Sequence, residues 1–557
     1  MLKKNYSLMK KEIQLISDFN LSLFYNYLSN KIDNKKYKLN KPNYELFVSS
    51  CYKTINSTKQ NHLIFVWNTP EETIKEFSNL INCENFSRTR LKKEINKYTD
   101  LLIELSKKTD HLLVTSWTLP FLHRGEYLKD LTSENGLSKN LNMINFEIAE
   151  KLKKKTNIYF FNIDFFFQKN FHSFNPKLWY ATKTPYNNQI FDAASAEVNQ
   201  IIKSLSIPPK KLLILDLDNT LWGGVVGELG WKNINLGGHD HIGEAYVDFQ
   251  KKIKILKNRG IQLAIISKND EKNALEVFKK NKQMILNLKD FAAWRINWKD
   301  KAANLLEITK ELNLSTDACV FIDDNINERN RIKSSIPDVF VPEWPDDPSF
   351  FSNEILKLNC FYSNGTTKED SLRTKFYKDE KSRQNTKTFF ESHSEWLKSL
   401  NIKIVSKNVS SDNKNRSLQL INKTNQMNLM TRRLTEEQIN KIIHDKNKTI
   451  KTFSISDKLG DMGLIGLYTI EHTKKGIKVL DFILSCRAFG RSIENYMAHT
   501  IIQLANKYKA KNITFNYLKT KKNNPALVFL KSLKLKKIDS KTYVYNNFKI
   551  NKPSHLM

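Results

Sequence analysis

The chain lacks any run of eighteen consecutive apolar residues, the length that a membrane-spanning helix needs. Its most apolar stretch, residues 158–167, contains Asn162 and Asp164, so we expect a buried strand there. The first residues, MLKKNYSLMKKE, lack the apolar core of a secretory signal peptide. These absences lead us to expect a cytoplasmic protein with no membrane partner.

Cysteine is scarce, with five in 557 residues, and the five are scattered without a CxxC pair. An odd, dispersed set of cysteines argues against a disulfide framework and against a zinc site. We expect most of them to be small buried hydrophobic residues, with Cys486 as the exception.

Acidic residues are in the minority, with 58 Asp and Glu against 90 Lys and Arg, which gives a formal net charge of +32. Such a charge suggests nucleic-acid binding. However, the lysines lie along the whole chain in Asn- and Lys-rich segments, and no zinc-finger, RRM or KH signature accompanies them. We attribute the net charge to a general bias of the sequence toward lysine and asparagine, and we expect no nucleic-acid partner. A basic surface does, however, favour an acidic protein partner.

The length of the chain is enough for three domains. Short apolar segments alternate with helical patterns over residues 1–200 and again over 205–350, which indicates an α/β domain with a mostly parallel sheet in each region. We expect a charged helical linker at 351–400 and a last α+β domain at 401–557. The predicted fold class is α/β, in three domains.

Asp18 and Asn20 follow the first expected strand of the N-terminal domain, where an α/β domain presents ligand sites. The alternative, which we favour, is that one of the two caps the following helix.

In the middle domain, three strongly apolar segments each end in polar residues. The first runs into Asp216-Leu217-Asp218-Asn219-Thr220, the second ends in Ser267, and the third runs into Asp323-Asp324. Because parallel strands bring their carboxyl ends to one edge of a sheet, these side chains are expected to meet there. A carboxylate at such a position can attack phosphorus, a second can move a proton, and others can hold magnesium.

This order of motifs, DxDxT, then Ser, then Lys, then DD, resembles the haloacid dehalogenase (HAD) superfamily. The resemblance implies that Asp216 is the nucleophile, that Asp218 is the acid/base, and that Ser267 and Lys301 contact phosphate. The implied ligands of Mg²⁺ are Asp216, Asp323, Asp324 and the backbone carbonyl of Asp218. Few residues separate the first motif from Ser267, so we expect no large cap domain and a site open to a bulky substrate.

A closer resemblance is to the FkbH-like branch, HAD phosphatase subfamily IIIC, carried by LLILDLDNTLWGGVVGELG, NWKDKAANL and VFIDDNINERNRI. Downstream, LQLINKTNQMNLMTRR, DKLGDMGLIG and LSCRAFGRSIE are similar to the C-terminal blocks of that branch. The N-terminal region resembles an SGNH-like domain but carries SDFN where a Gly-Asp-Ser nucleophile would stand, so we expect no hydrolase activity from it. The resemblance implies an enzyme that loads a glyceryl unit from 1,3-bisphosphoglycerate onto an acyl carrier protein.

The stretch CRAFGRS is similar to the acyl-CoA motif of GNAT acyltransferases. The resemblance implies a GNAT-like domain in which Arg487, Gly490 and Arg491 hold the phosphate of a carrier-borne phosphopantetheine, or of CoA, at a helix start. It also implies that Cys486 accepts the acyl group, because a helix start and neighbouring cations favour a thiolate. The alternative is a buried strand cysteine. The residues upstream that could bind the acyl or phosphate end are Asn425, Gln426, Asn428, Thr431 and Arg432.

Three other functions stay open from the sequence. The chain could be a plain Mg²⁺-dependent phosphatase, an acyltransferase or phosphatase in surface-polysaccharide biosynthesis, or a non-enzymatic scaffold that binds a carrier protein. The scaffold is disfavoured, because a scaffold has no use for a cluster of mutually repelling aspartates.

Overall fold

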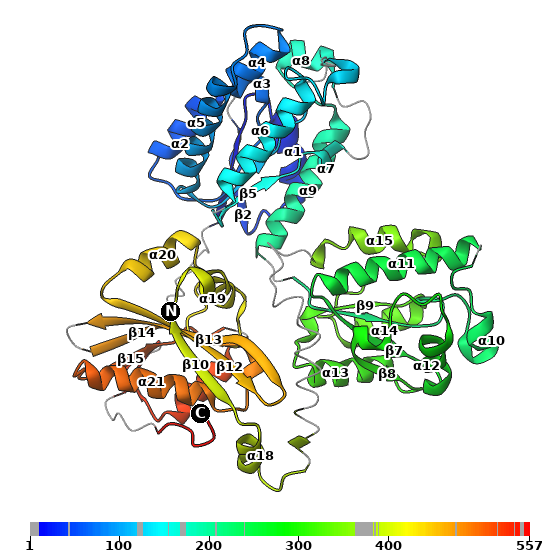
Figure 1. Ribbon diagram of the computed structural model, residues 1–557, viewed down its shortest axis with the longest axis vertical. Helices are drawn as coiled ribbons and strands as arrows, with labels where there is room; N and C mark the ends of the chain where they lie inside the picture. The colour runs from blue at the N-terminus through cyan, green and yellow to red at the C-terminus, as the bar shows by residue number, and fades with distance from the viewer. Residues whose placement is uncertain are drawn as a thin grey trace, which may run out of the picture. The chain divides into compact units, whose positions relative to one another are not determined.

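The structure is a computed structural model, and it describes residues 10–556 except 43–44, 120–125, 154, 168–173, 207–208, 239, 362–382, 384–385, 388, 474–475, 521, 540 and 546–550. It contains three separate sheets, each with its own covering helices (Figure 1). None of the described helices has both the length and the hydropathy needed to cross a bilayer. The predicted α/β class is confirmed.

The N-terminal sheet is parallel throughout, with the strand order β2-β1-β3-β4-β5. Its strands are β1 Lys11–Ile16, β2 Tyr37–Leu39, β3 Asn61–Val66, β4 Thr109–Thr115 and β5 Ile158–Phe161. Its helices are α1 Ser22–Lys31, α2 Phe47–Asn56, α3 Pro70–Thr73, α4 Lys75–Ile81, α5 Arg88–Ser106, α6 Leu137–Leu152, α7 Asp164–Phe167, α8 Pro176–Thr182 and α9 Asn188–Ser206.

Central strand β3 is buried at all of its positions, as expected for a parallel strand covered on both faces. Ile64 and Val66 pack with α2, α5 and α6 on one face. Phe65 faces the other way and packs against Phe24 of α1, with ring centroids 5.4 Å apart. The sheet is therefore the middle of three layers.

The middle sheet is also parallel, with the order β8-β7-β6-β9. Its strands are β6 Leu212–Leu215, β7 Gln262–Ser267, β8 Phe291–Ile296 and β9 Cys319–Ile322, and its helices are α10 Val226–Asn233, α11 His241–Asn258, α12 Glu271–Lys280, α13 Lys301–Glu311, α14 Ile326–Ser335 and α15 Phe351–Lys357. Alternate strand residues enter two cores, one with α11, α12 and α15 and the other with α13 and α14. Among the described residues between β6 and β7, the helices are α10 and α11, and these residues form no separate cap domain.

The C-terminal sheet is mixed, with the order β10-β12-β13-β14-β15-β17-β16, and β11 also pairs with β14. The strands are β10 Lys403–Asn408, β11 Met427–Asn428, β12 Lys448–Asp457, β13 Gly460–Thr473, β14 Gly476–Leu484, β15 Ile513–Asn516, β16 Lys536–Lys537 and β17 Thr542–Tyr545. The helices are α18 His393–Ser399, α19 Ser411–Lys423, α20 Glu436–His444, α21 Ile493–Lys507 and α22 Asn524–Ser532. Much of the expected linker at 351–400 lies outside the described residues.

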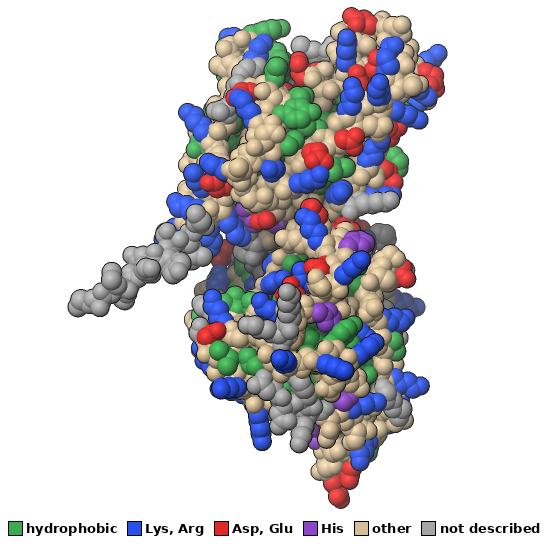
Figure 2. Space-filling model, turned by 90° about the vertical axis from the view of Figure 1, so that its left-hand side faces the viewer, with side chains coloured by type: hydrophobic (Ala, Val, Ile, Leu, Met, Phe, Trp, Pro, Cys, Tyr) green, Lys and Arg blue, Asp and Glu red, His purple; other side chains and the backbone are tan. Residues whose placement is uncertain are grey.

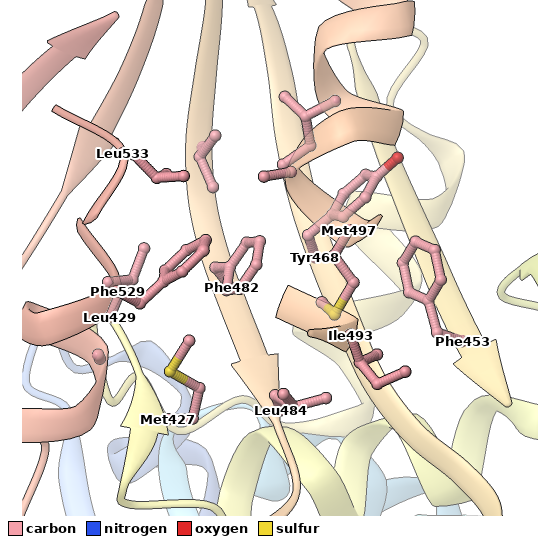
Figure 3. Packing of buried hydrophobic residues seen from close by; sticks show 14 of the residues in the cluster. Met427, Leu429, Phe453, Tyr468, Phe482, Leu484, Ile493, Met497, Phe529 and Leu533 are labelled. Carbon is pink, nitrogen blue, oxygen red and sulfur yellow. The ribbon is translucent and has the colours of Figure 1, made fainter. Parts of the chain in front are cut away.

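Two cores hold this sheet between its helices. Helices α21 and α22 pack on one face, where Phe482 of β14 stacks on Phe529 of α22 with ring centroids 4.9 Å apart (Figure 3). Helices α19 and α20 cover the other face. On the face of the molecule drawn in Figure 2, Lys and Arg are dispersed among Asp and Glu, which agrees with the even spread of lysine along the sequence.

Candidate active site

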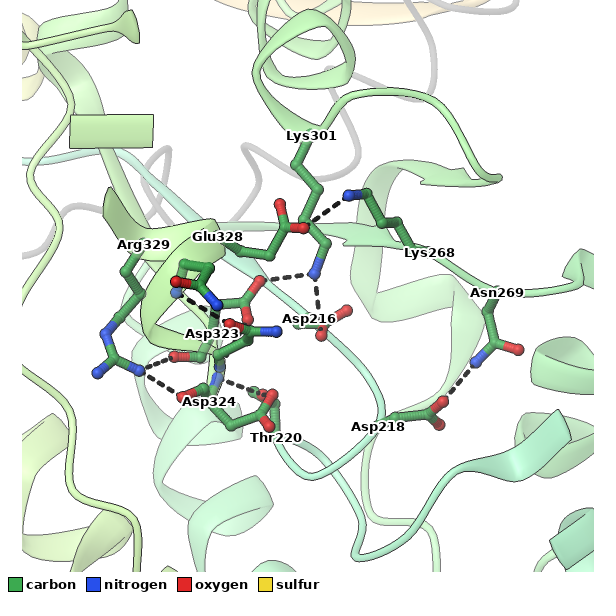
Figure 4. A network of polar contacts seen from close by, with 12 residues as sticks. Asp216, Asp218, Thr220, Lys268, Asn269, Lys301, Asp323, Asp324, Glu328 and Arg329 are labelled. Atoms are coloured by element: carbon green, nitrogen blue, oxygen red, sulfur yellow. Dashed lines mark hydrogen bonds and ion pairs between the residues drawn. The ribbon is translucent and has the colours of Figure 1, made fainter. Parts of the chain in front are cut away.

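Three aspartates meet at the carboxyl edge of the middle sheet. Leu215 and Ile322 are paired at the ends of β6 and β9, so the residues that follow them, Asp216 and Asp323, leave the sheet side by side. The order of strands reverses at this pair, which is where open α/β sheets bind ligands. One carboxylate oxygen from each of Asp216, Asp323 and Asp324 lies within 4.8 Å of the others (Figure 4).

Lys301 is the first residue of α13, and Asp300 begins this helix by accepting a hydrogen bond from the backbone N–H of Ala303. Its side chain is only 3% exposed, and its Nζ lies 2.6 Å from Asp323 Oδ2 and 3.0 Å from Asp216 Oδ2. Burial lowers the pKa of Lys301, but the two carboxylates outweigh it and hold that pKa above its usual value. The lysine therefore stays charged.

One lysine does not balance three carboxylates. Burial first, and then the charge of Asp216, raise the pKa of Asp323 and the pKa of Asp324. In addition, the buried Oδ1 of Asp216 has no hydrogen-bond partner among the residues that the structure describes. A cluster of carboxylate oxygens with an unsatisfied member and surplus negative charge fits a hard divalent cation such as Mg²⁺.

Asp218 lies apart from this cluster. Its Oδ1 accepts hydrogen bonds from Trp222 Nε1 at 2.9 Å and from the backbone N–H of Val226 at 3.2 Å. Its Oδ2 accepts one from Asn269 Nδ2 at 2.8 Å. The side chain is therefore held away from the three other carboxylates, and only its backbone carbonyl is left for the metal role that the resemblance implied. Burial raises the pKa of Asp218, which favours the protonated form that a general acid needs.

Ser267 ends β7 at the same edge and is 2% exposed, and its carbonyl accepts the backbone N–H of Asn297 at 3.0 Å. The next residue, Lys268, forms an ion pair with Glu328 of α14 at 2.6 Å. Ser267 and Lys301 thus lie at the edge of the sheet where the three aspartates meet.

The sequence interpretation missed Asn269, Trp222 and Arg329. The Nη1 of Arg329, a buried residue of α14, donates to the carbonyls of Asp323 and Asp324 at 2.8 and 2.5 Å. It thereby fixes the loop that carries two of the carboxylates. None of the three belongs to the DxD, Ser, Lys or DD motifs, and only proximity in space reveals their partners.

The C-terminal turn differs in part from the prediction. Cys486 is half-buried and opens a short 3-10 turn, Cys486–Ala488, whereas α21 begins only at Ile493. The expected helix start is therefore not beside Cys486, and the argument for a thiolate from a helix start is wrong. Gly490 adopts a φ of 74°, which a glycine accommodates without strain.

Arg491, expected to bind phosphate, is 2% exposed and turns back on its own loop. Its Nη1 donates to the carbonyls of Arg487 and Phe489 at 2.7 and 3.2 Å, so in this structure it shapes the turn. His393 donates from Nε2 to the carbonyl of Gly490 at 3.0 Å. Arg487 is half-buried, and its Nε lies 3.5 Å from Ser485 Oγ.

Polar side chains upstream, between Asn425 and Arg432, also form hydrogen bonds and ion pairs within the protein. Arg432 forms an ion pair with the buried Asp481, with Nε 2.8 Å from Oδ1, and Arg433 donates to Asn425 at 2.6 Å. Asn428 is fully buried, and its Oδ1 accepts the backbone N–H groups of Met430 and Thr431. Arg432 and Asn428 thus contact other parts of the protein, and these contacts stabilise the fold of this segment.

In the N-terminal domain we expected Asp18 or Asn20 to cap the following helix; the N-cap position is Leu21, and of the two residues it is Asn20 that bonds to the first residue of the helix. Asn20 Oδ1 accepts the backbone N–H of Ser22 at the start of α1, at 2.9 Å. Asp18 instead accepts two hydrogen bonds from Thr69, after β3, both at 2.7 Å. Burial raises the pKa of Asp18 to about 7.

No protein-family profile matches the chain, and a search of curated proteins finds no match. Among solved structures, the N-terminal part of the protein BF1531 from Bacteroides fragilis, which contains a phosphatase domain and is complexed with Mg, matches with a TM-score of 0.55 and 27% identity. The match covers 65% of this chain and 96% of that chain, so it extends beyond any single domain described above.

Two acetyltransferases match more weakly. The ribosomal-protein-S18-alanine N-acetyltransferase from Escherichia coli has a TM-score of 0.20 and 5% identity, over 25% of this chain and 90% of its own. Spermidine N-acetyltransferase from Vibrio cholerae has a TM-score of 0.21 and 12% identity, over 26% and 94%. Likenesses at this level support no argument. The chain is an α/β enzyme that is similar, over 65% of its length, to a solved structure containing a phosphatase domain.

Proposed function

We propose that the chain is a Mg²⁺-dependent phosphatase that acts on a phosphorylated acyl donor and passes the acyl group on. The observation that carries the phosphatase part is the cluster of Asp216, Asp323 and Asp324 around Lys301, with one oxygen of Asp216 unsatisfied. The Mg complexed by the B. fragilis protein supports the same ion here.

In this proposal an oxygen of Asp216 attacks phosphorus and forms an aspartyl-phosphate, and the bond from phosphorus to the substrate oxygen breaks. Asp218 gives its proton to that leaving oxygen and then takes a proton from the water that hydrolyses the aspartyl-phosphate. Lys301 and Ser267 contact the oxygens that are not transferred. Mg²⁺, held by Asp216, Asp323, Asp324 and the Asp218 carbonyl, would neutralise the charge of the phosphate.

For the acyl donor we propose 1,3-bisphosphoglycerate, and for the final acceptor an acyl carrier protein. The thiolate of Cys486 attacks the acyl carbon, forms a thioester and releases inorganic phosphate from that carbon. The phosphatase site removes the remaining phosphomonoester, and the glyceryl group then moves to the carrier thiol. The sequence resemblance and the partial exposure of Cys486 support this assignment.

The test is to incubate the protein with Mg²⁺ and 1,3-bisphosphoglycerate and to measure intact mass for the wild type and Cys486→Ala. A matched control is Cys83→Ala, since Cys83 is an exposed free cysteine. We expect a glyceryl adduct on the wild type and the control that is absent from Cys486→Ala. No adduct on any of them, with phosphate still released from simple phosphomonoesters, would refute the thioester step.

A plain Mg²⁺-dependent phosphatase is the second candidate, and the position of Cys486 away from the start of α21 favours it. Full phosphate release by Cys486→Ser on the natural donor would support this candidate. A role in surface-polysaccharide biosynthesis would instead show as acyl transfer to a sugar nucleotide from acyl-CoA without any carrier.

A further inference from the structure

The feature that carries a further inference is the edge of β14 beside β15. These two strands are parallel, and they pair only from Ile477 to Val479. Further along β14, the same edge pairs instead with β11, where Met427 lies opposite Leu484 and Asn428 opposite Ile483. The other edge of β14 is paired with β13 over these residues. The end of β14 therefore has a partner on both sides.

The segment Met427–Leu429 bridges β14 to the chain that follows β15. The backbone N–H of Leu429 donates to the carbonyl of Phe482 in β14 at 3.3 Å, and the Leu429 carbonyl accepts the N–H of Leu518 at 2.9 Å. The two parallel strands separate beyond residue 479, and the chain itself occupies the space between them as an additional strand.

This bridging segment is buried and anchored. Met427, Asn428 and Leu429 are at most 3% exposed. The side chain of Asn428 donates to the carbonyl of Thr424, and the Asn428 carbonyl accepts Nδ2 of Asn523 at 3.1 Å. Asn523 is itself fully buried and accepts the hydroxyl of Tyr517 at 3.0 Å. These polar groups of the segment therefore form their hydrogen bonds within the protein.

A pantetheine arm is an extended chain with two amide groups, and such a chain binds a sheet by pairing with an open strand edge. The acyl-CoA resemblance of the CRAFGRS stretch would place that arm along β14. The edge it needs is closed, and Arg491 is committed to its own turn. We infer that the C-terminal domain does not take CoA or an acyl-CoA between β14 and β15, because the Met427–Leu429 segment holds that place permanently.

Displacing the segment would expose two buried apolar side chains and break the hydrogen bonds to Phe482, Leu518 and Asn523. A ligand that had to do this would bind at least about a thousandfold more weakly than to an open edge. The inference also deepens the proposed function, on which this part rests. A carrier-borne thiol would reach Cys486 from the 3-10 turn at the end of β14 and not along the strand.

The test is hydrogen–deuterium exchange of the full chain, read by mass spectrometry over peptides that cover residues 424–434 and 477–486, with and without 1 mM CoA, together with calorimetric titration of CoA. We expect unchanged protection of both peptides and no saturable heat. Saturable binding that deprotects residues 427–429 would overturn the inference. Saturable binding with unchanged protection would place CoA elsewhere and support it.

A variant tests the anchoring independently of CoA. Asn523→Ala removes the donor to the Asn428 carbonyl, and we expect at least about tenfold faster exchange at residues 427–429. The matched control is Asn506→Ala, an exposed asparagine of α21 that should leave this exchange unchanged. Unchanged exchange in Asn523→Ala would show that the segment is not anchored as described and would refute its permanence. This outcome would leave the phosphatase proposal untouched, because that proposal rests on the middle domain.

Discussion

Replacing Lys301 with methionine tests the electrostatics of the candidate active site most directly. Its Nζ is the cation that bridges Asp216 and Asp323, at 3.0 and 2.6 Å, and its side chain is 3% exposed. Methionine keeps much of the volume but leaves both carboxylates buried without a cation. Removing one partner of a buried ion pair costs about 3–5 kcal/mol. We expect the middle domain of Lys301→Met to be destabilised by that amount in metal-free buffer.

The chain has several domains, so a single melting transition would not isolate this effect. Hydrogen exchange of peptides that span β6 and β9 reports the local opening free energy instead. A loss of 3–5 kcal/mol corresponds to exchange faster by about 10²- to 10⁴-fold. Mg²⁺ at about a hundred times its dissociation constant would restore about 2.7 kcal/mol, because it binds only the folded site.

The control for this experiment is Lys299→Met, which removes an exposed lysine two positions earlier in the same loop. It should exchange like the wild type with and without Mg²⁺. If Lys301→Met and Lys299→Met showed the same protection in metal-free buffer, the buried carboxylates would not depend on the lysine, and the argument for a charge-deficient metal site would fail.

Three further predictions follow from other parts of the structure. Asp218→Asn should lower kcat by about 10²- to 10⁴-fold yet keep the Mg²⁺-dependent protection of β6 against exchange, because its side chain lies outside the carboxylate cluster. Asp324→Asn should lose that protection, and an equal loss in both variants would contradict this division of roles. Ser492, at a φ of 56°, should tolerate glycine with a gain of about 0.5–1 kcal/mol, measured as slower exchange at the start of α21, and faster exchange would contradict the strain. Burial raises the pKa of Asp18 from its usual value of 3.8 to about 7, so its neutral form stabilises the N-terminal domain fully below about pH 4, and this stabilisation is lost as pH rises to about 7. The loss is on the order of 4 kcal/mol, and exchange of β1 and β3 peptides across this range should show it in the wild type and not in Asp18→Asn; parallel slopes would refute it.

Much of the candidate active site follows from the sequence. Asp216, Ser267 and Asp323 each stand at the end of an apolar segment, and parallel strands bring their carboxyl ends to one edge. Lys301 opens α13, whose start Asp300 caps. These are local patterns, so the meeting of the side chains could be predicted without knowing any distance.

The sequence was less informative where a residue acts through a distant partner. Nothing in the order of residues indicates that Asn269 and Trp222 hold Asp218, or that Arg329 donates to the two carbonyls of the metal loop. In the C-terminal domain, the pattern placed Cys486 just before a helix, but Cys486 opens a 3-10 turn of its own and α21 begins only at Ile493. A helix boundary depends on where the backbone can close its first hydrogen bonds, and the turn moves that point.

By itself, therefore, the sequence determined the α/β class, the parallel middle sheet and the acidic edge with its lysine, because each depends on a repeating apolar pattern and on the residue that ends it. Only the tertiary structure decided which way Asp218 turns, and that a two-residue strand at Met427–Asn428 closes the edge of β14. The physical reason is that a strand this short has no periodicity of its own, and the hydrogen bonds that form it come from chain segments far away in the sequence.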